Sequence, residues 1–92
     1  MIKTFHCKDT QALFEGKCPK RLKAFATVAE RKLQILDDAF AIEDLRSPPG
    51  NRLEALRGDR KGQLSIRIND QWRLCFRFED GNAFDVEIVD YH

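Results

Sequence analysis

Apolar residues in the first half of the chain recur at helical spacing. Between Phe25 and Phe40 they return every three or four positions, while charged and amide side chains fill the opposite side. This pattern predicts a long amphipathic helix with one face in a core. Thr27 and Glu30 fit a capping box near its start. Because the apolar period also reaches back to Leu22, two helices in a hairpin are an equal alternative.

Two weaker elements are expected before this helix. Residues 2–7 alternate loosely and can form a short first strand, and residues 10–14 can form a short helix. Gly16 and the Cys18-Pro19 pair end that helix, because glycine and proline both interrupt helical backbone.

The second half of the chain has the pattern of strands. Ser47-Pro48-Pro49-Gly50 cannot continue a helix, because proline lacks a backbone donor and biases the preceding residue to extended backbone. A short strand is possible over 53–56. Apolar and polar residues then alternate over 64–68, 72–78 and 84–88, with a turn at 80–82. These segments predict an antiparallel meander and therefore an α+β fold.

The register of this meander follows from placing the apolar side chains of neighbouring strands on one face. If Phe78 lies opposite Phe84, then Arg77 faces Asp85 as an ordinary cross-strand ion pair. In the same register Cys75 faces Glu87 and Arg73 lies beside Val89. Four aromatic residues then share the core face of the sheet: Trp72, Phe76, Phe78 and Phe84.

The same register places Arg67 directly opposite Arg73. Like charges at directly opposed positions destabilise a strand pair. This pairing is an argument that an anionic group, on a protein or a ligand, covers that face of the sheet.

Length and composition restrict the class of protein. The 92 residues, 42% of them hydrophobic and 34% charged, predict a single domain over residues 1–92. No stretch approaches the roughly 20 apolar residues of a membrane helix, so a soluble cytoplasmic protein is expected. Three widely spaced cysteines and two histidines support neither a disulfide framework nor a zinc site, and no metal or other cofactor is predicted.

The net charge of +1 hides an uneven distribution. Residues 46–77 hold eight cations, seven of them Arg, against three carboxylates, whereas the last fifteen residues hold five carboxylates and no Lys or Arg. Arg meets phosphate oxygens bidentately, so the cluster is a candidate nucleic-acid surface. Pairing of Arg with Asp or Glu on neighbouring strands is an equally good structural explanation.

The alternating pattern gives way at the C-terminus to Asp90, Tyr91 and His92. His exchanges a proton near neutral pH, Asp can orient it or accept a proton, and Tyr can bind a phosphate or stack on a base. A frayed polar tail is the alternative interpretation.

Four segments together resemble the HigB group of the RelE/ParE toxin superfamily: Ser47–Glu54, Gly62-Gln63, Ser65–Leu74 and the final Asp90-Tyr91-His92. The resemblance extends over essentially the whole chain. It implies a RelE/ParE-like fold, a small antiparallel sheet packed against N-terminal helices. It also implies a toxin that enters the ribosomal A site and cuts messenger RNA there. The implied partner is a HigA-type helix-turn-helix antitoxin.

Carried over residue by residue, the resemblance assigns catalytic roles to Arg57, Arg73, Asp90, Tyr91 and His92. Either Asp90 or His92 would act as base or acid, and the sequence leaves the choice open. The two arginines would stabilise charge on the phosphate, and Tyr91 would position or stack.

One position departs from the family pattern. Some HigB members have a His three residues before the basic residue at position 57, and this chain has Glu54 there. A mechanism with two histidines is therefore not expected. The other cations of the cluster would bind ribosomal RNA phosphates: Arg46, Arg52, Arg60, Lys61 and Arg67.

Other functions on the same fold are also considered. A ParE-like toxin that binds and poisons a topoisomerase would not need the residues after Val89, whereas a nuclease would lose toxicity without His92. A basic RNA-binding scaffold without activity is a third interpretation. A free monomer fits a protein that must enter the A site.

Overall fold

The computed structural model describes residues 1–90, which form one sheet backed by helices. The helices are α1 (Lys8–Phe14), η1 (Lys20–Phe25), α2 (Ala26–Asp38), η2 (Ile42–Arg46), η3 (Pro49–Asn51) and η4 (Gly58–Arg60), where η denotes a 3-10 helix. The strands are β1 (Glu54–Ala55), β2 (Leu64–Arg67), β3 (Trp72–Glu79) and β4 (Asn82–Asp90). The predicted α+β fold is confirmed.

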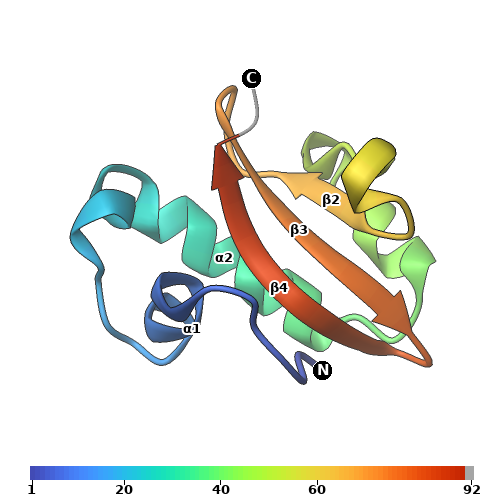
Figure 1. Cartoon of the computed structure of the whole chain (residues 1–92), viewed down its shortest axis with the longest axis horizontal. Helices are drawn as coiled ribbons and strands as arrows, with labels where there is room; N and C mark the ends of the chain where they lie inside the picture. Colours follow the sequence, from blue (N-terminus) through green and yellow to red (C-terminus); the bar gives the residue numbers. More distant parts are fainter. Residues whose placement is uncertain (91–92) are drawn as a thin grey trace.

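The strands form an antiparallel sheet in the order β1-β2-β3-β4. Figure 1 shows α2 lying behind the long β3 and β4 strands, with α1 beside it and η4 at the opposite edge of the sheet. The core lies between α2 and the sheet and includes five fully buried side chains from both layers: Leu33, Leu36, Ile66, Leu74 and Phe76.

The long helix begins differently from its prediction. η1 runs directly into α2, whose N-cap is Phe25 with no side-chain cap. The capping box at Thr27 and Glu30 is therefore wrong, because Thr27 already lies inside the first turn of α2. The 3-10 helix η1 buries Leu22 in the core, which accounts for the apolar period that reaches back to this residue.

The first segment is not a strand of the sheet. Ile2 and Phe5 form only isolated parallel bridges, to Ala83 and Val86 of β4. Between these bridges the backbone N–H of Asp85 donates to Oγ1 of Thr4, at 2.8 Å, instead of continuing a ladder. The predicted strand over 2–7 is thus reduced to two isolated bridges along the edge of β4.

A bulge in β4 changes the predicted register at one end of the sheet. Cys75 lies opposite Glu87 as predicted, but Arg77 lies opposite Phe84, so β4 carries one extra residue in this interval. Within the interval Asp85 has a φ of 55°, in the left-handed region that a bulge residue adopts. The predicted pairing of Phe78 with Phe84 is therefore wrong, and Phe78 lies opposite Ala83.

The bulge also moves Phe84 out of the core. Ala83 takes the core position and is fully buried, whereas Phe84 lies on the other face under the guanidinium of Arg77, 5.4 Å from the ring centre. The predicted ion pair survives, because Nε of Arg77 donates to Oδ2 of Asp85 at 2.8 Å. The other three aromatic residues are confirmed as part of the core or packed against it: Trp72, Phe76 and Phe78.

Candidate active site

The candidate site lies at the end of the sheet where β3 begins and β4 ends. Trp72 lies opposite Asp90, and Arg73 lies opposite Val89 in the adjacent pair. The side-chain amide of Gln71 donates from Nε2 to Oδ2 of Asp90 at 3.0 Å. Asp90 is exposed, so its carboxylate faces solvent. The bond from the Gln71 amide orients this carboxylate.

The two faces of the sheet separate Asp90 from Arg73. Residues in register share a face, so Asp90 has the parity of Trp72, which packs toward the helices. Trp72 stacks on Phe25 with ring centres 4.9 Å apart, and the Arg21 guanidinium lies 5.9 Å from its ring. Arg73 has the opposite parity. The structure therefore brings the two groups to one end of the sheet and not to one face of it.

Arg73 is nearly buried on the outer face, with 9% of its surface exposed. Its Nε donates to Oγ of Ser65 at 2.8 Å, and its Nη2 donates to the backbone carbonyl of Arg52 at 2.6 Å. Both acceptors belong to neutral groups on neighbouring segments of the chain. The two bonds fix the orientation of the guanidinium plane, which a single contact would leave free to turn.

The predicted pairing of Arg67 with Arg73 is confirmed. The side chains diverge, because Arg67 forms an ion pair with Asp70 in the β2–β3 turn while Arg73 turns toward Ser65. Asp70 supplies a negative partner from within the chain. The like-charge pair by itself therefore no longer requires an external anion over this face.

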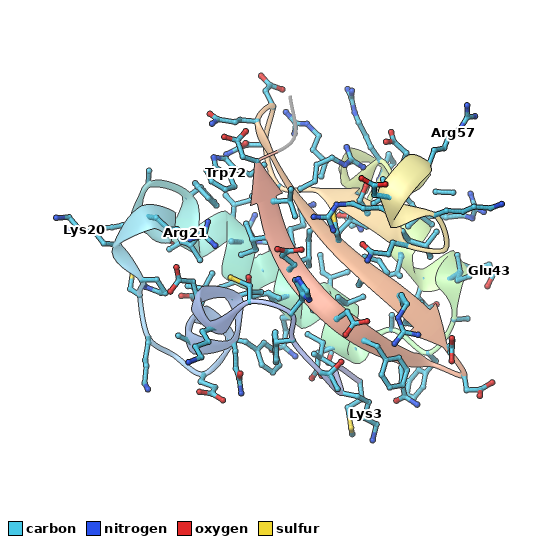
Figure 2. All side chains as sticks on the ribbon, viewed as in Figure 1. Lys3, Lys20, Arg21, Glu43, Arg57 and Trp72 are labelled. Carbon is cyan, nitrogen blue, oxygen red and sulfur yellow. The ribbon has the colours of Figure 1, made fainter. Side chains whose placement is uncertain are left out.

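The remaining predicted cations occupy several different surfaces. Arg57 is exposed at the start of η4, and Figure 2 shows it extending outward on the side of the molecule away from Trp72. Arg60 is half-buried and bound to Gln63 and to Glu87, with its Nη2 3.2 Å from the Glu87 carboxylate. Three others are exposed: Arg46, Arg52 and Lys61. Tyr91 and His92 lie outside the described residues.

A family model provides the deciding comparison. It describes a RelE-like toxin of the type II toxin-antitoxin system HigB, and it matches residues 3–92. The chain belongs to this HigB-like toxin family.

Curated relatives of this HigB-like toxin support the same family. "Endoribonuclease HigB" of Proteus vulgaris is 34% identical over 93 residues and is covered, like this chain, along its full length. "Toxin HigB-1" of Vibrio cholerae is 58% identical over 56 residues, which are 61% of this chain and only 59% of the Vibrio protein.

Solved structures agree on the fold of the HigB-like toxin. The YoeB-YefM toxin-antitoxin complex from Staphylococcus aureus contains a chain with a TM-score of 0.62 and 15% identity, covering 100% of this chain and 98% of that one. A point mutant of YafQ from E. coli gives a TM-score of 0.59 and 18% identity, covering 98% of this chain and 91% of that one. At these identities the likeness establishes the RelE/ParE fold alone.

The sequence did not indicate two residues of the site, Ser65 and Gln71. Ser65 could have been found, because it has the same strand parity as Arg73 and lies two register pairs away from the Arg67–Arg73 pair. Gln71 directly precedes the first residue of β3, where a side chain can reach the end of β4.

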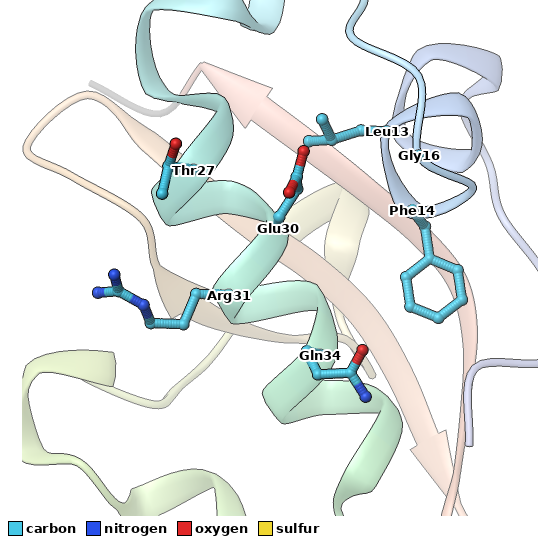
Figure 3. Close-up of a pocket in the computed structure, with 7 residues that line it drawn as sticks. All are labelled: Leu13, Phe14, Gly16, Thr27, Glu30, Arg31 and Gln34. Carbon is cyan, nitrogen blue, oxygen red and sulfur yellow. The ribbon is translucent and has the colours of Figure 1, made fainter.

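The HigB-like toxin also has a concavity between α1 and α2, shown in Figure 3, with a volume of about 390 Å³. Leu13, Phe14, Glu30 and Arg31 are among its lining residues, and none of the predicted site residues is. Within residues 1–90 no three His, Cys, Asp or Glu side chains are placed to hold a metal ion. Over the same range no helix is long and apolar enough to cross a membrane.

Proposed function

We propose that this HigB-like toxin is a ribosome-dependent endoribonuclease that cuts messenger RNA in the ribosomal A site and so inhibits translation. One observation carries the proposal. In a chain of this family, the nearly buried guanidinium of Arg73 is held in a fixed direction at the end of the sheet where Asp90 lies. The full-length similarity to a protein named endoribonuclease supports it.

The reaction is an internal attack. The 2'-hydroxyl loses its proton, the 2'-oxygen forms a bond to phosphorus, and the bond from phosphorus to the 5'-oxygen breaks as that oxygen gains a proton. We assign the two proton transfers to Asp90 and His92, a contribution of about 10² to 10⁴ in rate. Arg73 stabilises the negative charge that develops on the phosphate, Arg57 assists it, and Tyr91 positions or stacks on the nucleotide.

The exposed basic residues serve a second purpose in this proposal. Arg46, Arg52 and Lys61 bind ribosomal RNA phosphates, together with the partly paired Arg60 and Arg67. Such contacts depend on salt and tolerate changes of sequence. The proposed partners are the small ribosomal subunit with its messenger RNA and a HigA-type helix-turn-helix antitoxin. The toxin acts in the cytoplasm as a monomer.

The test is to express the wild type, Asp90→Ala, His92→Ala and the double variant in growing cells and to map messenger 5' ends. The wild type should produce new cuts only on translated messages, and the double variant should produce none. The single variants separate the two proton-transfer roles. Asp38→Ala, which removes an exposed carboxylate from the end of α2, is the matched control.

A different result would redirect the assignment. If the wild type stops growth without cutting messages, the nuclease proposal fails. A topoisomerase is then the first binding target to examine, because ParE-like toxins share this fold.

A further inference from the structure

Lys32 is an unusual residue in this molecule. It lies on the buried stripe of α2, three residues after Ala29, and only 9% of its surface is exposed. Its Nζ donates to Oδ1 of Asn51 at 2.5 Å, and no carboxylate within residues 1–90 forms a salt bridge with it. A buried ammonium with a neutral partner costs folding free energy, so its presence calls for an explanation.

The surroundings increase that cost. Burial lowers the pKa of Lys32 below its ordinary value, and the positive charges of Arg31 and Arg67 lower it further. Two cations of α2, Lys32 and Arg31, therefore lie within electrostatic reach of one another, and Arg67 of β2 lies within reach of Lys32. A methionine would fill the same volume without this penalty.

Asn51 connects Lys32 to an irregular loop. This side chain is fully buried, and its Nδ2 donates to the carbonyls of Leu45 and Ser47, at 3.2 and 3.3 Å. Its backbone N–H also donates to the carbonyl of Pro48 at 2.9 Å. The charge-assisted bond from Lys32 thus holds one amide that in turn fixes the path of residues 45–51.

The next residue transfers this constraint to the candidate active site. Arg52 has φ 45° and ψ 57°, a left-handed conformation that is uncommon for a residue with a side chain. In this conformation its carbonyl accepts the bond from Nη2 of Arg73 at 2.6 Å. The strained turn is therefore coupled directly to the orientation of the guanidinium.

We propose that Lys32 is a positioning residue for RNA cleavage. Through Asn51 it fixes the turn at Arg52, and the Arg52 carbonyl then holds the Arg73 guanidinium in the direction from which it meets the scissile phosphate. The inference rests on the proposed nuclease function. A misplacement of about 1 Å in such a group costs catalysis far more than binding, so the effect of Lys32 falls on kcat.

A double-mutant cycle tests this coupling. Ribosome-bound messenger cleavage is measured for the wild type, Lys32→Met, Arg73→Lys and the double variant. Lys32→Met should lower kcat about tenfold with little change in KM, because it releases the Arg52 carbonyl. With Arg73→Lys, which keeps a cation but lacks the planar fork, the same change should cost less than about twofold.

Conservative and matched variants complete the cycle. Lys32→Arg, which keeps the charge and the donors, should recover most of the lost rate. Lys17→Met removes one exposed lysine from the loop after α1 and should cleave like the wild type. If Lys32→Met does not fold, Lys32→Gln replaces it in the cycle, since the shorter amide removes the charge and the original reach.

A second measurement does not depend on cleavage. The Arg73 Nε–H should exchange slowly with solvent in the wild type and in Lys17→Met, and much faster in Lys32→Met, by nuclear magnetic resonance. Equal losses of kcat in both Arg73 backgrounds, or unchanged exchange of this proton, would overturn the inference. If the wild type cuts no RNA while the proton responds as expected, the nuclease proposal fails and the structural coupling stands.

Discussion

The Nε–H of Arg73 on β3 donates to the hydroxyl oxygen of Ser65 on β2 at 2.8 Å, and both residues are buried on the outer face of the sheet. The two residues are not directly opposed, since Ser65 lies opposite Cys75. The bond therefore runs diagonally across the strand pair. This diagonal bond fixes the direction of the guanidinium, which the backbone pairing of the two strands alone would not do.

Replacing Ser65 should impair cleavage. Ser65→Ala removes this acceptor from the buried Arg73 Nε–H, which costs about 1–3 kcal/mol of stability, and it loosens the guanidinium. We expect the chain to remain folded with kcat lowered about tenfold, as followed by denaturant unfolding and by ribosome-bound cleavage. Ser47→Ala, at an exposed loop position, is the control. An unchanged rate in Ser65→Ala would show that Arg73 needs no orientation by this hydroxyl.

A second prediction concerns the bond from Gln71 to Asp90. Gln71→Glu has nearly the same shape but places a second carboxylate against Asp90, so it should reduce single-turnover cleavage more than Gln71→Ala does. The loss expected for Gln71→Ala is about threefold to tenfold, the scale of one net hydrogen bond.

The chain offers a close control for this change. Gln34 donates from Nε2 to Oδ1 of Asp38 at 3.0 Å on the exposed surface of α2, the same kind of contact at the same length. Gln34→Glu should therefore change stability by a similar amount and leave cleavage unaltered. Equal effects of the two Gln→Glu changes on cleavage would remove Gln71 from the site.

The turn between β3 and β4 gives a prediction about stability. Gly81 has φ 79°, and a Cβ added there would lie 3.0 Å from the Phe40 carbonyl oxygen. Gly81→Ala should lower the free energy of unfolding by about 1–3 kcal/mol, with roughly 4–8 °C of Tm lost for each kcal/mol. Gly50→Ala, where the new methyl group meets nothing within 4 Å, is the control in the same thermal scan. Equal Tm values for the two variants would contradict the close approach.

The sequence was sufficient for most of the sheet and insufficient for its irregularities. The pairing of Arg67 with Arg73 followed from strand alternation, because side-chain parity is strict along a regular strand. The bulge at Asp85 did not follow, since Asp is only one of several residues that tolerate a positive φ. One inserted residue was enough to place Ala83 in the core instead of Phe84.

The contacts that orient Arg73 also could not be predicted from the sequence. The partner of Lys32 is Asn51, 19 positions away in an irregular loop. The group of Arg52 that accepts the bond from Arg73 is a backbone carbonyl, which every residue type has, so the residue type gives no indication of this contact. Periodicity does place Lys32 on the inner stripe of α2, three residues from Ala29 and four from Leu36. A charged residue in such a position is a signal that the sequence does contain, although Lys32 was not among the predicted site residues.

The buried ammonium of Lys32 makes stability depend on pH. Burial, with Arg31 and Arg67 nearby, lowers its folded-state pKa below the ordinary 10.5. Between these two values the unfolded state binds more protons than the folded state, so Lys32 makes the free energy of unfolding rise with pH. Urea unfolding from neutral pH toward 10.5 should therefore show the wild type gaining stability relative to Lys32→Met. Lys17→Met, which lacks an exposed lysine instead, should follow the wild type. A constant difference between the wild type and Lys32→Met over this range would mean that the ammonium is as well solvated in the folded chain as in the unfolded one.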